Sequence, residues 1–462
     1  MSDTQRLSGG PPEGASPPRL GLSRRALLGG LAGIAGLGLA GCAMPAASGA
    51  APGPTIPPAT GRVTLTYWAW IKDLQKVLDV YNASQDRIRV VASSIASGNQ
   101  GGYAKILSAI AAGGGPDIAQ VELKIVPEFA FAGALTELGR YGAHEVADRF
   151  DPSAWTQAVV GDNVYAVPQD TGPSVMFYNR AVLEDELGLK PPRTWPEFAD
   201  LMGEVSTAKR SLMSISPADT GPMVMWMQQS GARWFRPEGE SWVVSLHDEG
   251  TMRVAEFWDS LFDKGLVDTS VNPFSTPWMT AAASGDMLGF IGGSWGDALI
   301  EGVPGGSGKW AVAPMPRWTD IGVGSGQHGG SAGAVTSNCA HPHEALEFLT
   351  WLHTSHEGID GLIEHTGIGW SPARDYIGRS RMQPSEFYSG QRYNQQVVAP
   401  AAKEQNFDWV FSPITQRSEA VLADALRRRA LEGKPLRESM PEVEDRLVAI
   451  MRNIGLDVEV AP

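Results

Sequence analysis

Cysteine is scarce in this chain, which has two, Cys42 and Cys339, among 462 residues. A framework of several disulfides is therefore excluded. Cys339 lies in an apolar-rich stretch, where a buried and inert thiol is the usual role of a lone cysteine. Stability must come from an apolar core, and a chain of this length with 43% apolar residues can bury a large one.

An excess of positive charge is also missing. The 37 Lys and Arg are outnumbered by 51 Asp and Glu, which gives a formal net charge of -14 at pH 7. A chain with this balance repels phosphate backbones and anionic membrane surfaces. We therefore expect no nucleic-acid partner.

Signatures of cofactor and metal chemistry are incomplete. The run Gly308-Lys309-Trp310 is similar to a phosphate-binding loop, but Val303 stands where the first Gly must be and Trp310 where Ser or Thr must hold magnesium. Five histidines cluster in the sequence without a Cys or Asp that completes a ligand set, namely His341, His343, His353, His356 and His365. We expect neither a metal nor a cofactor.

The N-terminus has the pattern of an export signal. Arg24 and Arg25 precede an apolar run over 26–40, and the run ends in Leu39-Ala40-Gly41-Cys42. A permanent membrane helix needs roughly 20 apolar residues, so a cleaved signal peptide over 1–41 fits better. The ending resembles the bacterial lipobox, which implies a lipid on Cys42 and an extracytoplasmic protein anchored to the cell membrane. Twin-arginine and Sec export both remain open.

A flexible tether is predicted over 42–61, where Pro, Ala, Gly, Ser and Thr dominate. Lipidation of Cys42 at its start would leave Cys339 without an intramolecular disulfide partner. Some 18 residues of such a chain reach on the order of 25 Å. That length is enough to hold a folded body just off a membrane.

The remainder alternates between strand and helix patterns. The periodicity predicts strands over 63–68 and 88–91, helices over 74–81 and 103–112, and a third strand after Asp117. Such alternation favours a largely parallel sheet with helices on both faces. Thr194 and Glu197 have capping-box spacing before a helix, and an amphipathic helix is predicted over 248–264.

A series of motifs points to a known family. The central one is the segment 161–180, which contains Gly-Asp-Asn-Val-Tyr-Ala-Val-Pro168 and Met-Phe-Tyr178-Asn179. It resembles the segment by which family 1 extracellular solute-binding proteins, the maltose-binding-protein type, cross from one lobe to the other. The resemblance continues in order through 115–118, 192–195, 290–295, 313–316, 329–331 and 369–372.

The resemblance implies an α/β, periplasmic-binding-protein-like fold of type II, with two lobes, a hinge and an inter-lobe cleft. The first lobe would comprise 62–168 plus 317–368, and the second 171–314 plus 372–455. The crossings would lie near Pro168, Pro314 and Gly369. The implied function is that of the substrate-binding component of an ABC importer, which delivers a carbohydrate to the membrane permease and catalyses no reaction. We expect a monomer.

Candidate ligand contacts follow from the chemistry of sugars, which present apolar C–H faces and a rim of hydroxyls. Flat aromatic rings and planar polar side chains suit such a ligand. The chain has 15 Trp, more than its 9 Tyr, and many lie at predicted strand ends or loops. The predicted contacts are Trp70, Asn99, Gln120, Glu122, Asp170, Trp295, Trp370 and Trp409, of which Trp295 matches the stacking position of the family.

Several alternatives remain open at this point. Glu122 could be an ordinary surface carboxylate, and Asp117 is better explained as a turn-fixing residue. A secreted glycan-active enzyme would also use a Trp-lined cleft with Asp and Glu, provided two carboxylates faced each other at catalytic separation. The same fold could instead bind a polyol or a glycerol phosphate derivative. The sequence does not name the sugar.

Overall fold

A computed structural model describes residues 55–239, 241–377, 381–406 and 408–461. The predicted signal peptide, Cys42 and the tether up to residue 54 lie outside the described residues. Within the described ranges, no helix combines the length and the apolar character needed to span a membrane.

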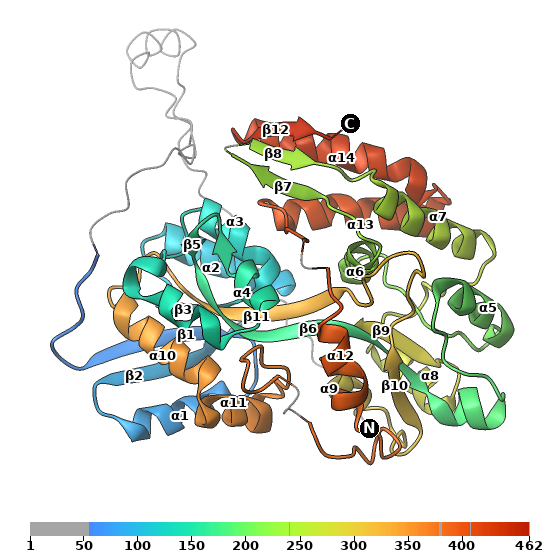
Figure 1. The fold of residues 1–462 in the computed structure, drawn as a ribbon, viewed down its shortest axis with the longest axis horizontal. Coiled ribbons are helices and arrows are strands. Elements are labelled where there is room, and N and C mark those ends of the chain that lie inside the picture. The colour runs from blue at the N-terminus through green and yellow to red at the C-terminus, as the bar shows by residue number, and fades with distance from the viewer. Residues whose placement is uncertain (1–54, 240, 378–380, 407, 462) are drawn as a thin grey trace, which may run out of the picture. The chain divides into compact units, whose positions relative to one another are not determined.

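A mixed seven-stranded sheet runs through the centre of the fold (Figure 1). Its order is β2-β1-β3-β11-β6-β10, and β9 also pairs with β6. The strands β1, β2 and β3 are mutually parallel, whereas β11, β9 and β10 pair antiparallel with their neighbours. The bounds are β1 Val63–Ala69, β2 Ile88–Ser94, β3 Ile118–Glu122, β6 Ala166–Asn179, β9 Gly289–Gly293, β10 Trp310–Pro314 and β11 Gln327–Val335.

Smaller strands form two further sheets. The antiparallel pair β7 (Phe235–Glu238) and β8 (Ser241–Val244) is extended by β12 (Asp457–Val460), which runs parallel to β8. The short strands β4 (Val159–Val160) and β5 (Asn163–Val164) pair with each other.

Helices cover the sheets. They are α1 Leu74–Ser84, α2 Gly102–Ala111, α3 Val126–Phe131, α4 Pro152–Gln157, α5 Trp195–Val205, α6 Gly221–Gln229, α7 Glu249–Asp263, α8 Thr276–Ser284, α9 Gly296–Ile300, α10 Pro342–Thr354, α11 His356–Gly361, α12 Ala399–Ala402, α13 Thr415–Glu432 and α14 Leu436–Asn453. Short 3-10 turns include η1 Gly98–Gln100 and η2 Leu123–Ile125. The predicted strands, and the helices around 74–81, 103–112 and 248–264, are confirmed.

The local signals that predicted these elements have the expected contacts. The Thr194 side chain accepts a hydrogen bond from the Glu197 N–H at 3.2 Å and caps α5. Asp248 does the same for α7 through the Thr251 N–H at 2.7 Å. The Asp117 carboxylate accepts from the backbone N–H and the hydroxyl of Thr66, which agrees with a structural role.

The apolar cores divide into two halves. Two clusters of buried side chains draw on residues 63–167 and 332–362 and define the first lobe. Two others draw on residues 175–315 and 370–458 and define the second lobe. The strand β6 contributes Ala166 and Val167 to the first half and Val175 to Tyr178 to the second. The chain therefore crosses between lobes inside this strand.

The second crossing between the lobes lies later in the chain than Pro314, the position predicted from the sequence. Residues just after 316 contact the second lobe: Arg317 pairs with Glu404 and Asp320 with Arg253. The following strand, β11, pairs with β6 from Gln327 onward and then with β3. The contacts therefore place this crossing in β11, and the remaining predicted boundaries stay predictions.

A buried ion pair fixes the helices of the second lobe. Asp259 of α7 is 1% exposed, and its Oδ1 lies 3.0 Å from Nε of Arg429 on α13. The same carboxylate accepts hydrogen bonds from the N–H groups of Leu436 and Arg437 at 2.8 and 3.1 Å. One side chain of α7 thus caps the first turn of α14 and neutralises a buried guanidinium.

Replacing Asp259 with Ala should destabilise the protein by about 3–5 kcal/mol, because it removes the buried carboxylate that pairs with Arg429 and accepts hydrogen bonds from two N–H groups of α14. Chemical denaturation followed by circular dichroism measures this loss. Asp263→Ala is the matched control, since Asp263 also pairs with Arg429 but its side chain is 66% exposed. Its effect should be about 1 kcal/mol or less, and equal effects of the two changes would contradict this interpretation.

Candidate functional site

A cavity of about 320 Å³ lies between the two lobes. The first lobe contributes the η1 loop and the segment after β3, and the second contributes the loop before α6 and the first turns of α13. The described lining residues are Gly98, Gly101, Ala104, Lys124, Ala218, Asp219, Thr220, Gln416, Glu419, Ala420 and Ala423. We call it the inter-lobe cavity.

Lys124 joins the two lobes inside this cavity. Its Nζ lies 2.7 Å from the Glu419 carboxylate of the second lobe and 3.5 Å from Glu122 of the first. Burial alone would lower the pKa of Lys124, but the carboxylates of Glu122 and Glu419 outweigh it and raise the pKa above its ordinary value. The amine therefore stays protonated while largely removed from water.

Glu122 is oriented by a tyrosine from α2. The Tyr103 hydroxyl donates to Glu122 Oε2 at 2.5 Å, and burial raises the pKa of Tyr103, so it remains a donor. The Tyr103 ring packs edge-on against Trp70 at 6.1 Å. A Cβ at Gly98 would lie 2.1 Å from the Tyr103 ring, so only glycine permits this approach. Glu122 is thus a positioned carboxylate and not a freely solvated one.

Further contacts cross between the lobes beside the cavity. The Glu128 carboxylate of α3 accepts hydrogen bonds from the Gln416 N–H at 2.8 Å and from its side-chain amide at 3.0 Å. The Thr415 hydroxyl donates to the Lys124 carbonyl at 2.9 Å, and Phe131 packs edge-on against Trp242 at 6.0 Å. A carboxylate of the first lobe therefore caps the N-terminus of α13 in the second.

His328 and Trp295 lie next to the inter-lobe cavity. Trp295 Nε1 donates to the His328 carbonyl at 2.6 Å, and the two rings lie 5.2 Å apart. Burial lowers the pKa of His328, with Asp219 acting in the opposite direction, so its imidazole is neutral. A Cβ at Gly221 would lie 2.4 Å from His328 Nε2, which brings the histidine against the loop that carries Asp219.

Glycines make room for the Trp295 indole. A Cβ at Gly293 would lie 2.3 Å from Trp295 Nε1, and one at Gly329 would lie 2.7 Å from it. These two positions belong to the 290–295 and 329–331 motifs. The glycines of two motifs far apart in sequence therefore serve one purpose, which is to seat this ring between β9 and β11.

Asp170 and Gln120 converge on one serine at the lobe crossing. Asp170 Oδ1 accepts from the Ser331 N–H at 2.7 Å and from its hydroxyl, and Gln120 Nε2 lies 3.4 Å from Ser331 Oγ. Gln169 donates to the same hydroxyl at 2.9 Å. Burial raises the pKa of Asp170 to about 6, the Ser331 hydrogen bonds oppose this, and the Glu122 charge adds to it.

The structure thus brings most of the predicted contacts into one region. Trp70, Gln120, Glu122 and Asp170 are linked through Tyr103 and Ser331, and Trp295 reaches the region through His328. None of them appears among the described residues that line the inter-lobe cavity directly. The Asn99 side chain is outside the description. All of these roles therefore stay predictions.

Two predicted tryptophans lie elsewhere. Trp409 is 8% exposed and packs against Trp234 at 5.3 Å in the core of the second lobe. Trp370 is 7% exposed and lines a separate cavity of about 230 Å³, together with Thr171, Pro173 and Tyr376. This cavity also draws on both lobes, with Ser153 from the first and Asn394 from the second, so the role of Trp370 stays a prediction.

Sequence reasoning missed the residues that line the inter-lobe cavity itself. Lys124 stands two residues after Glu122, at the same strand end, and this proximity was a usable signal. Asp219 lies in a turn, and Gln416 and Glu419 lie one helical turn apart on α13. No local pattern marked these three, because a fold that pairs distant segments brings them together.

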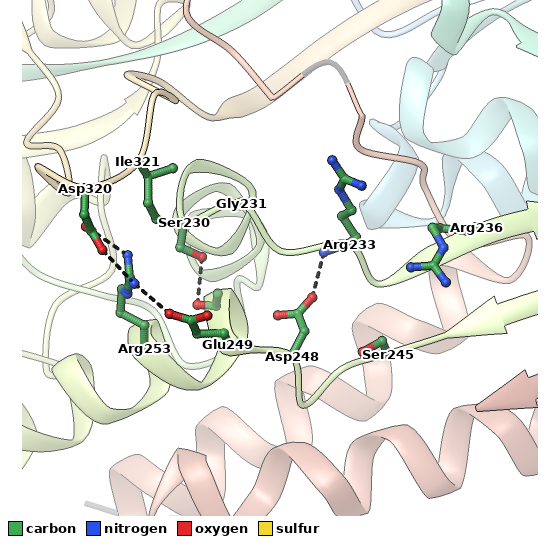
Figure 2. A pocket seen from close by; sticks show the side chains of 11 residues that line it. Ser230, Gly231, Arg233, Arg236, Ser245, Asp248, Glu249, Arg253, Asp320 and Ile321 are labelled. Carbon is green, nitrogen blue, oxygen red and sulfur yellow. Dashed lines mark hydrogen bonds and ion pairs between the residues drawn. The ribbon is translucent and has the colours of Figure 1, made fainter. Parts of the chain in front are cut away.

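A second polar pocket, of about 440 Å³, lies wholly within the second lobe (Figure 2). Its charges are paired with one another or with near neighbours: Arg253 lies 2.9 Å from Asp320 and 3.1 Å from Glu249, and the Arg233 N–H donates to Asp248 at 2.7 Å. Because this pocket draws on one lobe, lobe closure would not change it. The inter-lobe cavity is the better candidate.

In the described part of the chain, no group of three or more His, Cys, Asp and Glu residues is placed so that it could hold a metal ion. Cys339 is buried, and burial raises the pKa of its thiol to about 12, with its position next to Asp117 adding to the effect. This agrees with an inert thiol.

Comparison with known proteins agrees with this architecture. The family model described as bacterial extracellular solute-binding protein matches residues 63–357. An arabinooligosaccharide-binding protein of Halalkalibacterium halodurans is 24% identical over 279 residues, which are 58% of this chain and 61% of that protein. A lactose-binding protein of Rhizobium radiobacter is 25% identical over 49% of this chain and 54% of its own length. The match thus spans less than two thirds of either relative.

Solved structures show the same fold over nearly the whole described body. The galacto-N-biose-/lacto-N-biose I-binding protein of a Bifidobacterium longum ABC transporter, in complex with lacto-N-biose, has a TM-score of 0.77 at 26% identity and covers 87% of this chain. A binding protein of B. animalis subsp. lactis in complex with β-1,6-galactobiose has a TM-score of 0.73 at 24% identity and covers 86%. Both are matched over 100% of their own length.

The model of the family covers well over half of this sequence. On that evidence the chain belongs to the bacterial extracellular solute-binding protein family.

Proposed function

We propose that this protein captures an oligosaccharide in the inter-lobe cavity and delivers it to the permease of an ABC importer. The observation that carries the proposal is a cavity whose polar lining comes from both lobes, with Lys124 of one lobe paired to Glu419 of the other. A carbohydrate ligand is supported by the names of the relatives and structural neighbours. These names refer to arabinooligosaccharides, lactose, lacto-N-biose and galactobiose.

Ligand binding would act through a shift in population toward the closed state. Contacts that cross between lobes, such as Glu128 with Gln416, exist only when the lobes meet. A ligand held by both lobes adds free energy to that state alone, because the open state offers it half of the contacts. The importer would then recognise the closed form.

The lining suits a hydroxyl-rich ligand. The side chains of Asp219, Gln416 and Glu419 are planar groups that can each accept or donate two hydrogen bonds to neighbouring hydroxyls. The half-buried Trp295 ring is fixed by its hydrogen bond to His328 and offers an apolar surface beside them.

Catalysis is not part of the proposal. Glu122 and Asp170, the pair that a glycosidase would need, are already held by Tyr103, Lys124 and Ser331. Two Gly-x-Ser-x-Gly sequences, a pattern that can frame a nucleophile, occur around Ser294 and Ser331. Ser294 is fully buried, and Ser331 lies inside β11 with its hydroxyl hydrogen-bonded to Asp170 and Gln169.

We further propose that the mature protein is a monomer held outside the cytoplasm by a lipid on Cys42. The motif 39–42 supports the lipid, and the Pro- and Ala-rich segment over 42–61 would provide the reach between membrane and body. A tethered capture protein remains near its permease, where the released ligand is needed.

Saturating oligosaccharide should stabilise the protein. A ligand at 100 times its dissociation constant contributes about 2.7 kcal/mol to the free energy of unfolding, which thermal denaturation detects. Trp295→Ala should weaken binding about tenfold, or about 1.4 kcal/mol, in isothermal titration calorimetry, because it removes the ring beside His328.

Trp318→Ala is the matched control for Trp295→Ala. Trp318 is also half-buried in the second lobe, but it packs against Phe257 at 5.5 Å and Arg253 at 5.6 Å, away from the inter-lobe cavity. Its loss should leave affinity unchanged. Equal affinities of wild type and Trp295→Ala would remove Trp295 from the site.

Glu128→Ala should raise the dissociation constant about three- to tenfold by weakening the closed state, since two hydrogen bonds across the lobes are lost, each worth about 0.5–1.5 kcal/mol. Stopped-flow fluorescence should show a faster off-rate. Glu137→Ala is the control, because Glu137 bonds to Gly139 and Arg140 within its own lobe. An unchanged off-rate for Glu128→Ala would argue against these contacts as part of closure.

A further inference from the structure

The inter-lobe cavity carries more negative than positive charge. Among the described residues that line it, Lys124 is the one cation, whereas Asp219 and Glu419 are both carboxylates. Glu122 stands behind Lys124 at 3.5 Å, and Asp170 lies deeper and feels the charge of Glu122. The single ammonium group of Lys124 thus lies among the carboxylates of Glu122, Asp219 and Glu419, with Asp170 deeper in the protein.

The neighbouring groups do not correct this imbalance. His328 lies close to Asp219, Lys124 and Glu122, but burial lowers its pKa and keeps it neutral. Burial raises the pKa of Glu419, and although Lys124 opposes this, Glu122 and Asp219 add to it. The carboxylates therefore repel one another in a partly dehydrated space.

The second polar pocket provides a contrast within the same lobe. Its lining has three arginines, Arg233, Arg236 and Arg253, and three acids, Asp248, Glu249 and Asp320. There the charges balance, and the Arg253 guanidinium lies between two carboxylates (Figure 2). An unbalanced acidic lining is thus a property of the inter-lobe cavity and not of the surface of this acidic protein in general.

We infer that the cleft selects its sugar by charge, favouring an oligosaccharide that carries a protonated amino group and rejecting one that carries a carboxylate or a phosphate. This inference rests on the proposed function. An ammonium group between Asp219 and Glu419 would supply the missing positive charge, and its attraction to the partly buried Glu419 carboxylate would be less screened than in bulk water. An anionic sugar would face those carboxylates with only Lys124, already paired, in its favour.

The test compares three disaccharides by isothermal titration calorimetry at slightly acidic pH, where sugar amines are protonated: a glucosamine disaccharide, its N-acetylated neutral counterpart, and one containing a uronic acid. The amine form should bind at least about tenfold tighter than the neutral form, and the uronic acid at least about tenfold weaker than it. Raising the salt from about 20 mM to about 500 mM should narrow both differences.

Glu419→Gln should reduce the preference for the amine form over the neutral form to about threefold or less, whatever its effect on the affinity for the neutral disaccharide, because it removes one carboxylate of the cavity. Glu249→Gln is the matched control, since it removes the same charge from the same lobe at the second pocket. It should leave the preference intact. Equal loss in both variants would mean that net charge, and not the cavity, sets the preference, which would overturn the inference.

The outcomes separate this inference from the proposed function. Neutral and amine forms that bind equally well would overturn selection by charge and leave carbohydrate capture standing. If none of the three disaccharides nor longer neutral oligosaccharides bound, the proposed function would fail together with the inference. Tighter binding of the uronic acid disaccharide than of the amine form would reverse the predicted charge preference and overturn the inference.

Discussion

A protonated lysine held between carboxylates of two lobes is the interaction on which the site depends. Lys124 has one partner in each half of the molecule, Glu122 at 3.5 Å and Glu419 at 2.7 Å. Burial alone would lower the pKa of this amine, and the two carboxylates together outweigh that effect. These two ion pairs link the lobes and place one positive charge among the carboxylates of the inter-lobe cavity.

The fold places this interaction through its shared strands. β6 begins among the cores of the first lobe and ends among those of the second, while β11 connects β6 to β3. Glu122 ends β3, and Lys124 follows it, directly beside the crossing. α13 brings Glu419 from a segment almost 300 residues later, and Asp259 anchors that helix to α7 and α14 through Arg429. Stability of the second lobe and the geometry of the cavity are therefore connected.

Much of the fold was predictable from sequence, because its signals are local. The alternation in 63–68 and the cap at Thr194 each report on the few residues around them, and the structure confirms both. The motif order identified the two-lobed fold. The crossing expected near Pro314 was placed too early, because the contacts of Arg317 and Asp320 with the second lobe come from residues distant in sequence.

The site was only partly predictable, because its residues meet through tertiary contacts. The sequence proposed Glu122 from its place after a strand and Asp170 from its place beyond Pro168, and both roles stay predictions. Asp219 and Glu419 line the inter-lobe cavity but carried no local mark, and Trp409 packs in a core. A crystal structure of the protein with a saturating oligosaccharide would show where the sugar binds. We expect sugar density in the inter-lobe cavity, beside the Lys124–Glu419 ion pair and in contact with both lobes. Sugar bound to one lobe alone, or in the pocket around Arg253, would contradict this expectation.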